Sequence, residues 1–375
     1  MENIIKYKKK IFIVIGTRPE LIKQIPVYYE CIKKIGKGNV LLINSGQHKQ
    51  FLNIYVNEKK IKFDITLKNL QSSKSLKKNI KKSINSFYNL INKFQPKIVL
   101  VQGDTTTAAG CAYASSLSGS LIAHNEAGLR TFDNKNPYPE ELNRRLISSV
   151  SDIHFAPTNL NKNNLINEGV DKNKIFVVGN PGIDSFFYAL KKKKTKEAEN
   201  IITYSQKKNK KIVFLTAHRR ESIGKNFENL FKKLKIFFKK NEDYLLITCQ
   251  HPNKFASRYI KKYLSNLNNS LIFHPFDYFT TCKIIRQSSF VITDSGGIQE
   301  ECSTIGVPTV VCRKITERKE AEKIGITRVC GFNSNNLFEA LNWAKNKIRK
   351  KKWIKRPYGN GNSAKKIAKI LSNYI

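Results

Sequence analysis

The chain has 375 residues, 40% hydrophobic and 10% aromatic, which is too long for one ordinary core and predicts two domains of roughly 150 to 200 residues. Its formal net charge is +40, from 68 Lys and Arg against 28 Asp and Glu, but the lysines are scattered over every segment without interleaved aromatic residues or a recognition helix, which argues against a nucleic-acid partner. Seven cysteines without a C-x-x-C motif exclude a disulfide scaffold, and apolar runs too short to span a bilayer argue against a membrane protein, so a cytoplasmic protein is expected.

Short apolar runs alternate with longer amphipathic segments through the first half of the chain. Runs that are apolar on both faces are typical of buried parallel strands, and the amphipathic segments between them are typical of helices that cover a sheet. The runs lie at residues 11–16, 97–104, 120–128, 151–158 and 174–180. They predict a Rossmann-like N-terminal domain over residues 1–178.

The same pattern restarts after a polar, lysine-rich stretch. Its apolar runs lie at residues 211–218, 244–251, 270–275, 289–297, 306–313 and 326–331. They predict a second Rossmann-like domain over residues 179–362, with a hinge near 177–185 and a C-terminal helix, 363–375, that packs back on the first domain. The expected fold class is therefore α/β, with two parallel sheets facing across a cleft, and ligands of such sheets bind at the carboxyl ends of the strands.

Two predicted helix starts have the features of an anion site. In the first, the string from Thr17 to Glu20 indicates a capping box, and Arg18 lies beside the free N–H groups of the first turn. In the second, Asp294 ends a strand and the Ser295–Gly297 turn opens a helix that a pyrophosphate can approach closely. Glu301, one turn further on, can accept hydrogen bonds from two ribose hydroxyls. An ordinary capped helix is the alternative at each place.

Carboxylates lie at other predicted strand ends. Asp104 follows one strand and Glu126 follows the next, and Glu140 and Glu141 come after Pro139 at a helix start. The alternatives are that Asp104 is a plain N-cap and that Glu140 only complements the helix dipole. A structural role explains Glu126 less well, because Glu is a poor cap and a carboxylate at a buried strand end indicates a functional role.

His218 ends the first strand of the second domain and is followed by Arg219 and Arg220. A histidine that titrates near neutrality beside two guanidinium groups suits phosphate binding or proton transfer, and a structural histidine is the alternative. The chain contains no P-loop, H-E-x-x-H or G-x-S-x-G motif. We therefore expect neither a metal nor another cofactor.

Several motifs follow one another along the chain: G-T-R-P-E, Q-G-D-T-T-T, E-A-G-L-R-T, P-E-E-L-N-R, H-R-R-E-S, D-S-G-G-I-Q-E-E, T-E-R and P-Y-G-N-G. In this order they resemble the non-hydrolysing UDP-N-acetylglucosamine 2-epimerases, enzymes of the two-domain GT-B arrangement. The resemblance covers nearly the whole chain. It implies a cytoplasmic homodimer that interconverts UDP-N-acetylglucosamine and UDP-N-acetylmannosamine for cell-surface polysaccharide precursors, without a cofactor.

The resemblance also implies roles for particular residues. Catalysis falls on Asp104, Glu126, Glu140 and His218. The UDP-sugar is expected to be held by Arg18, Lys23, Ser295, Gly296, Gly297, Glu301 and Arg318. A regulatory second substrate site falls on Gln47, His48 and His251. Two strings depart from the family's common form, FDYFTT at 276–281 and NPGID at 180–184, which leaves the contacts to uracil and the identity of the sugar open.

The reaction implied by the resemblance is an elimination. Carbon 2 of the sugar has no carbonyl beside it to acidify its proton, so UDP leaves from C1 as a base takes the C2 proton, and UDP then adds back to the glycal while a proton reaches the other face. Two faces of one carbon need acid and base groups on opposite sides, and which carboxylate is acid and which is base stays open. The alternatives are a hydrolysing 2-epimerase, an epimerase of a related UDP-2-acetamido sugar, a glycosyltransferase and a nucleic-acid-binding protein.

Overall fold

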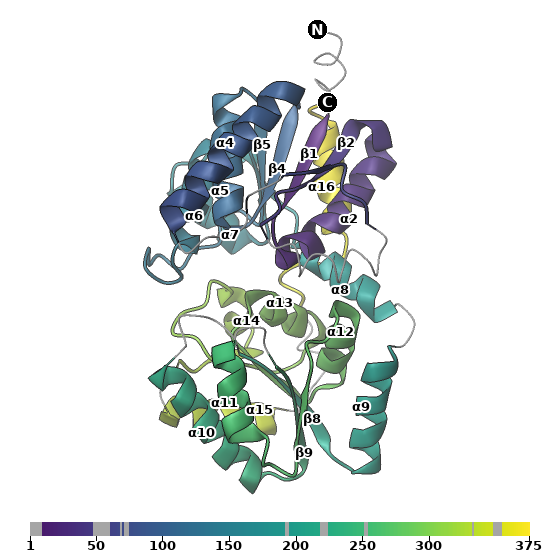
Figure 1. The fold of residues 1–375 in the computed structure, drawn as a ribbon, viewed down its shortest axis with the longest axis vertical. Helices are drawn as coiled ribbons and strands as arrows, with labels where there is room; N and C mark the ends of the chain where they lie inside the picture. The colour runs from purple at the N-terminus through teal and green to yellow at the C-terminus, as the bar shows by residue number, and fades with distance from the viewer. Residues whose placement is uncertain are drawn as a thin grey trace. The chain divides into compact units, whose positions relative to one another are not determined.

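The computed structural model describes residues 10–47, 61–67, 70, 75–191, 195–217, 224–250, 254–331, 334–347 and 355–375. The chain divides into two compact units (Figure 1). Unit 1 comprises Met1–Ser185 and Tyr358–Ile375, and unit 2 comprises Phe186–Pro357. Each unit has its own parallel sheet with helices packed on it, which confirms the predicted α/β class.

Unit 1 is built on a seven-stranded parallel sheet in the order β3-β2-β1-β4-β5-β6-β7. Its strands are β1 (Ile11–Ile15), β2 (Val40–Asn44), β3 (Ile65–Thr66), β4 (Ile98–Gln102), β5 (Leu121–Asn125), β6 (Ile153–Ala156) and β7 (Ile175–Val177). The strand order reverses direction between β1 and β4, as in doubly wound sheets. The apolar runs did not predict β2 or β3, and β3 has only two residues, which are too few to show a period.

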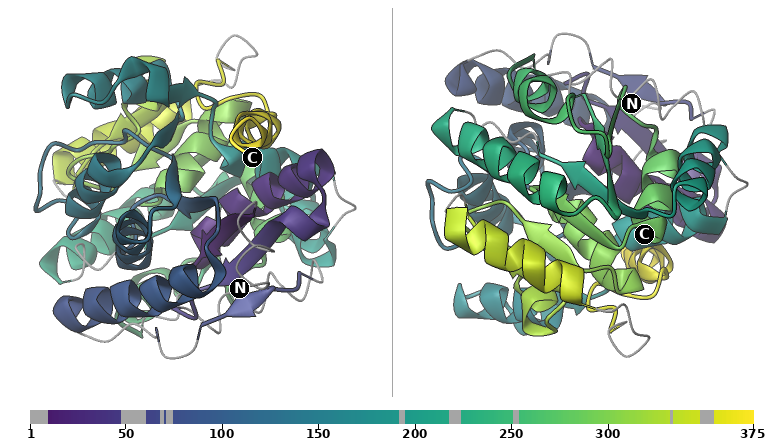
Figure 2. Two further views of the ribbon diagram at one scale, coloured as in Figure 1. Left: turned by 90° about the horizontal axis from the view of Figure 1, so that it is seen from above. Right: turned by 90° about the horizontal axis from the view of Figure 1, so that it is seen from below.

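The helices of unit 1 pack closely in pairs. Helix α4 (Leu76–Phe94) lies so near α5 (Thr106–Leu117) that a Cβ atom on Gly110 would be 2.5 Å from Ser83 Oγ. Helix α16 (Ser363–Ser372) lies beside α2 (Arg18–Ile35), as the views in Figure 2 show. The other helices described in this unit are α6 (Glu140–Val150), α7 (Asn159–Asn167), α8 (Pro181–Lys191), which continues into unit 2, and the short 3-10 helices η1 (Lys37–Asn39) and η2 (Lys172–Lys174).

The first turn of α8 and the residue before it hold the start of α16 and the segment that leads to it. The Asp184 carboxylate accepts the backbone N–H groups of Ser363 at 3.2 Å and Ala364 at 3.0 Å, donors that a helix start would otherwise leave free. Burial raises the pKa of Asp184 to about 6. The Asn180 N–H donates to the Tyr358 carbonyl oxygen at 2.8 Å. Because of these contacts the structural division lies a few residues from the boundaries expected at 178 and 362.

Unit 2 is built on a six-stranded parallel sheet in the order β10-β9-β8-β11-β12-β13. Its strands are β8 (Lys211–Thr216), β9 (Tyr244–Cys249), β10 (Ser270–Phe273), β11 (Phe290–Thr293), β12 (Thr309–Val311) and β13 (Thr327–Val329). They follow the predicted runs in place and order. Strand β11 ends at Thr293, next to the expected strand end at Asp294, and α13 begins at Gly296 within the predicted Ser295–Gly297 turn.

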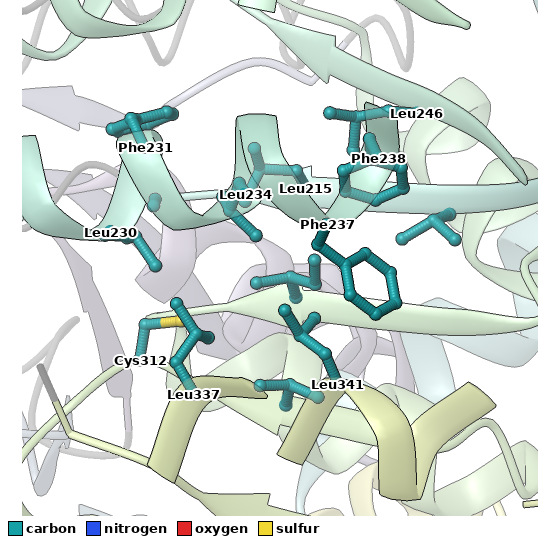
Figure 3. Packing of buried hydrophobic residues seen from close by; sticks show 14 of the residues in the cluster. Leu215, Leu230, Phe231, Leu234, Phe237, Phe238, Leu246, Cys312, Leu337 and Leu341 are labelled. Atoms are coloured by element: carbon teal, nitrogen blue, oxygen red, sulfur yellow. The ribbon is translucent and has the colours of Figure 1, made fainter. Parts of the chain in front are cut away.

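The core of unit 2 includes side chains from its sheet and from several helices, among them α10 (Lys225–Lys240) and α15 (Ser334–Asn346). Figure 3 shows Phe237 and Phe238 of α10 among the packed side chains, with Leu246 from β9 and Leu341 from α15. Burying one such phenylalanine contributes roughly 1.5–3 kcal/mol. The other helices described in this unit are α9 (Lys196–Lys207), α11 (Lys254–Leu264), α12 (Tyr278–Gln287), α13 (Gly296–Ile305) and α14 (Lys319–Lys323). Across the described ranges of both units, no helix is long and apolar enough to cross a membrane.

Candidate active site

Glu20 fills the start of α2. Its carboxylate accepts the N–H groups of Gly16 and Thr17, each at 2.7 Å, and the Thr105 hydroxyl at 2.7 Å. Burial raises the pKa of Glu20, and these hydrogen bonds oppose that shift. The predicted capping box is present. The two N–H groups that Glu20 accepts precede the first helical residue, Arg18, which is half-buried.

Glu126 is the centre of the polar cluster of unit 1 and lies directly after β5. Lys23 of α2 donates from Nζ to both carboxylate oxygens at 2.6 Å. Gln102 Nε2, at the end of β4, donates to Oε2 at 2.7 Å, and Asn180 Nδ2, just before α8, donates to Oε1 at 3.1 Å. Glu126 is only 6% exposed, so these donors stabilise its charge where water has little access.

The amide groups beside Glu126 have defined orientations. The Glu126 N–H donates to Asn125 Oδ1 at 3.0 Å, and Asn125 Nδ2 donates to Gln102 Oε1 at 2.7 Å, which turns Gln102 Nε2 toward the carboxylate. Reversing either amide would bring two donors or two acceptors together. These hydrogen bonds link the Glu126 N–H to the Glu126 carboxylate through Asn125 and Gln102, and together they fix the position of the carboxylate.

The backbone at Glu126 is in an unusual conformation. Its φ is +66°, in the left-handed region, and Gly103 at the corresponding place after β4 has a φ of +68°. This conformation costs a residue other than glycine roughly 1–2 kcal/mol. The two strand ends are also close, because a Cβ atom on Gly103 would lie 3.4 Å from Glu126 Oε2. A glutamate at a position that suits glycine indicates that its side chain is needed there.

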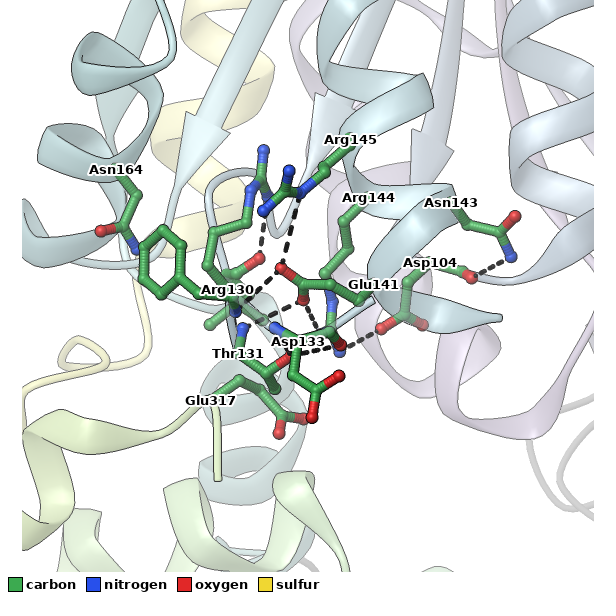
Figure 4. Close-up of polar contacts among 12 residues, drawn as sticks. Asp104, Arg130, Thr131, Asp133, Glu141, Asn143, Arg144, Arg145, Asn164 and Glu317 are labelled. Carbon is green, nitrogen blue, oxygen red and sulfur yellow. Dashed lines mark hydrogen bonds and ion pairs between the residues drawn. The ribbon is translucent and has the colours of Figure 1, made fainter. Parts of the chain in front are cut away.

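Asp104 follows Gly103 and is paired with Arg144 of α6 (Figure 4). Arg144 Nη2 donates to Asp104 Oδ2, and Asn143 Nδ2 donates to the Asp104 carbonyl oxygen at 2.8 Å. The alternative in which Asp104 is a plain N-cap is wrong, because Thr105 Oγ1 caps α5 by accepting the Ala108 N–H at 3.0 Å. The Asp104 carboxylate is therefore positioned by α6 and is not part of the capping of its own helix.

Glu140 and Glu141 have different surroundings. Glu141 is fully buried, and its oxygens accept the N–H groups of Thr131 at 3.0 Å and Phe132 at 3.2 Å. It also accepts Arg144 Nη1 at 3.0 Å. Glu141 thus fixes the loop before α6, as Figure 4 shows. Glu140, the first residue of α6, is half-buried and is the more exposed of the two acids.

Arg130 belongs to a structural ion pair. It is 2% exposed and donates to Glu168 Oε1 at 2.8 Å and Oε2 at 2.6 Å, and to Ser148 Oγ at 3.0 Å. A bidentate pair of this kind consumes the face of the guanidinium that would otherwise bind a phosphate. Arg130 therefore joins α6 to the end of α7.

Gln47 is the one expected regulatory residue that the structure describes. Thr107 Oγ1, in the first turn of α5, donates to Gln47 Oε1. The other two residues expected at that site, His48 and His251, lie outside the described residues, as does His218.

The polar cluster of unit 2 surrounds the start of α13. Ser295 is the N-cap position, and Gly296 and Gly297 open the helix after the fully buried Asp294. Tyr278 Oη donates to Glu301 Oε1 at 2.9 Å. A ribose bound here would share the Glu301 carboxylate with Tyr278.

Arg318 is held beside this helix start by two carboxylates. Its Nε donates to Glu300 Oε1 at 2.8 Å and its Nη1 donates to Glu317 Oε1. Glu317 Oε2 also accepts Arg313 Nη1 at 2.9 Å. The guanidinium lies so near Gly296 that a Cβ atom there would be 2.8 Å from Arg318 Cζ. Glycine at this position therefore makes room for the arginine.

The structure brings together some of the expected residues and adds others. Lys23 and Glu126 form one ion pair, and Arg318 lies against the start of α13. The motifs did not indicate the two amide donors to Glu126, which are Gln102 and Asn180, 24 and 54 residues away in the chain. The only signal was their place at the edges of the Q-G-D-T-T-T and N-P-G-I-D strings. Within the described residues, no three His, Cys, Asp or Glu side chains are arranged to hold a metal ion.

Two doubly wound units in tandem, each with a polar cluster where its strands end and its helices begin, define the GT-B class of α/β proteins. The family model described as UDP-N-acetylglucosamine 2-epimerase matches residues 32–372. The chain belongs to this family, which confirms the resemblance seen in the motifs.

Individual relatives are similar over their full length. UDP-N-acetylglucosamine 2-epimerase of Campylobacter jejuni is 38% identical, with 97% of each chain covered. A crystal structure of the Neisseria meningitidis UDP-GlcNAc 2-epimerase bound to UDP-GlcNAc has a TM-score of 0.89 and 33% identity, covering 97% of this chain and 100% of that one. The Methanocaldococcus jannaschii enzyme, in complex with UDP-GlcNAc and UDP, has a TM-score of 0.84 and 32% identity, covering 97% of this chain and 99% of that one.

Proposed function

We propose that this chain interconverts UDP-N-acetylglucosamine and UDP-N-acetylmannosamine by eliminating UDP and adding it back. Family membership supports the substrate class, since relatives from Neisseria meningitidis and Methanocaldococcus jannaschii bind UDP-GlcNAc. One observation in this chain carries the proposal: Glu126, in a left-handed backbone conformation, has its carboxylate fixed by Lys23 and two amides. A second carboxylate, Asp104, is fixed by Arg144 at the neighbouring strand end.

These acids suit a proton transfer at carbon 2. A base takes the C2 proton, the C–H electrons form the C1–C2 double bond, and the C1–O bond breaks so that UDP leaves with its oxygen. In the return step the UDP oxygen attacks C1 and a proton reaches C2 from the opposite face. Each positioned acid or base contributes typically 10² to 10⁴ in rate. Glu126, Asp104 and Glu140 are the groups proposed for these transfers, with His218 as a fourth.

Unit 2 is proposed to hold the UDP part. The N–H groups at the start of α13 and the positive charge of Arg318 beside them form a favourable environment for a pyrophosphate. Ser295, Gly296 and Gly297 supply the helix start, and Glu301 faces the ribose. Arg18 and Lys23 of unit 1 are also proposed to bind the substrate, and Lys23 pairs with Glu126 in the structure.

Proton exchange at C2 tests the proposed reaction. Purified protein is incubated with UDP-N-acetylglucosamine in D₂O without nicotinamide, metal or acceptor, and the mixture is followed by NMR. We expect UDP-N-acetylmannosamine that carries deuterium at C2, and a Glu126→Gln sample run beside it should exchange far more slowly. A product that keeps its original C2 hydrogen would contradict elimination. Free N-acetylmannosamine formed as fast as UDP would replace the proposal with the hydrolysing reaction, and no turnover of this sugar would point to a related UDP-2-acetamido sugar.

The proposal includes a cytoplasmic homodimer. All seven cysteines are free thiols, and six of them are buried, which suits a reducing compartment. The dimer is implied by the resemblance to the family. Light scattering after gel filtration tests it, with twice the chain mass of 43.0 kDa as the expected result and a single chain mass as the contradicting one.

A further inference from the structure

Asn180 lies where the chain leaves unit 1, immediately before α8, and it is fully buried. Its Oδ1 accepts the Gly182 N–H at 3.0 Å, which turns its Nδ2 toward Glu126 Oε1 at 3.1 Å. Its backbone N–H donates to the Tyr358 carbonyl oxygen at 2.8 Å, and its own carbonyl oxygen accepts the Ile183 N–H at 2.9 Å. One residue therefore connects the Glu126 carboxylate, the start of α8 and the returning segment before α16.

The donors around Glu126 differ in charge. Lys23 is an ammonium group, and it makes the carboxylate a weaker base, whereas the Gln102 and Asn180 amides orient the carboxylate without adding a charge. An anionic substrate competes with Glu126 for Lys23. When Lys23 turns to the substrate, Gln102 still holds Oε2 and Asn180 still holds Oε1.

We infer that Asn180 is a positioning residue for Glu126, whose amide keeps the carboxylate in place while Lys23 engages the anionic substrate. The inference rests on the proposed function, in which Glu126 moves a proton at C2. Asn180 itself touches neither the reacting carbon nor the proton. Because its backbone is bound to Tyr358, it also ties the position of Glu126 to the point where the chain re-enters unit 1.

The Asn180→Asp variant separates this role from a structural one. It keeps the shape of the side chain and the oxygen that accepts the Gly182 N–H, but it replaces the donor to Glu126 with an acceptor. We expect kcat to fall by about 10- to 100-fold, with KM changed by less than about threefold. The acid limb of the kcat profile should move to higher pH, because the lost donor and the added negative charge both raise the pKa of Glu126.

Two other ionisable groups face Glu126, Lys23 and His124, and the substitution leaves both in place. Burial lowers the pKa of His124 to about 3. Asn39→Asp is the matched control in the same unit. It makes the same change at an amide that donates to the Ile35 carbonyl oxygen at 2.6 Å, away from Glu126. Its kcat and its acid limb should match those of the wild type.

A double-mutant cycle with Glu126→Gln completes the test. If Asn180 acts through Glu126, adding Asn180→Asp to Glu126→Gln should change kcat by less than about threefold, and residual rates are measured in long NMR incubations. An unchanged acid limb in folded Asn180→Asp, or an equal loss of kcat in both backgrounds, would overturn the inference. If Asn180→Asp does not fold by circular dichroism, Asn180→Ala takes its place with the same expected directions. A wild-type rate in Glu126→Gln would instead overturn the proposed role of Glu126 itself.

Discussion

The polar clusters of the two units have central groups of opposite charge. In unit 1 a carboxylate, Glu126, is held by an ammonium group and two amides. In unit 2 a guanidinium, Arg318, is held by the carboxylates of Glu300 and Glu317. Both arrangements compensate buried charge, but the group at the centre of each has the opposite sign. The same architecture of strand end and helix start can therefore serve proton transfer in one unit and anion binding in the other.

The largest expected effect comes from removing the central charge of unit 1. Glu126→Gln keeps the size of the side chain but loses the base, so turnover should fall by at least about 10²-fold. Deuterium exchange at C2 measures this loss, and circular dichroism checks the fold. Glu339→Gln, at an exposed residue paired with Arg328 at 3.4 Å, is the control and should behave as the wild type. Equal rates in the two variants would remove Glu126 from the reaction.

The next effect concerns the central charge of unit 2. Arg318→Lys keeps the charge but cannot contact Glu300 and Glu317 with one planar fork, so UDP should bind about tenfold more weakly. Glu317→Gln sharpens the comparison. If Glu317 positions Arg318, its loss should also weaken UDP binding, although it removes a negative charge. Tighter binding of UDP by Glu317→Gln in calorimetric titration would show that the carboxylate only repels the ligand.

A smaller effect is expected from the two glycines that open α13. Gly296→Ala places a Cβ atom 2.8 Å from Arg318 Cζ and should lower the free energy of unfolding by about 1 kcal/mol. Gly297→Ala adds its Cβ where the described residues leave open space, so stability should be unchanged or slightly higher. Urea unfolding without ligand measures both. Equal losses at the two positions would mean that Arg318 does not rest on Gly296.

The fold could be predicted from the sequence where strands are buried on both faces. The strands of unit 2 read as continuous apolar runs because helices cover both sides of the sheet, and their order along the chain is preserved in the structure. Strand β3 could not be found in this way, because two residues have no period. The helix start at Gly296 was predicted from the Ser295–Gly297 turn after the strand end, and the structure confirms it.

The sequence indicated single residues of the site but not which of them contact one another. Motifs indicated Lys23 and Glu126 separately, yet their ion pair joins residues 103 positions apart and depends on the packing of α2 against the sheet. Asn180 was missed because its partner lies on another strand end. The left-handed backbone at Glu126 was also hidden, since the sequence has a glutamate where a glycine would have indicated it.

The smallest expected effect is a difference between the two units in how their stability depends on pH. Burial lowers the pKa of His124 to about 3 and of His154 to about 4, and both histidines lie in the sheet of unit 1. Their unfolded pKa is near 6.5, so the unfolded chain binds more protons below that pH, and stability that is complete above about 6.5 is lost as the pH falls. Asp184 opposes this, because its raised pKa of about 6 lets the folded unit take up a proton first. In unit 2 the described histidine, His274, is exposed.

From pH 7 to pH 6 we therefore expect the free energy of unfolding of unit 1 to fall by less than about 1 kcal/mol. The free energy of unfolding of unit 2 should fall by a smaller amount. Two probes distinguish the units, because both tryptophans, Trp343 and Trp353, belong to unit 2, whereas far-UV circular dichroism reports on the whole chain. The urea midpoint should fall by circular dichroism and stay nearly constant by tryptophan fluorescence. His124→Gln removes one titrating group, so its midpoint should be lower at both pH values but should fall less between them. An unchanged pH dependence in His124→Gln would show that this buried histidine does not remain neutral in the folded unit.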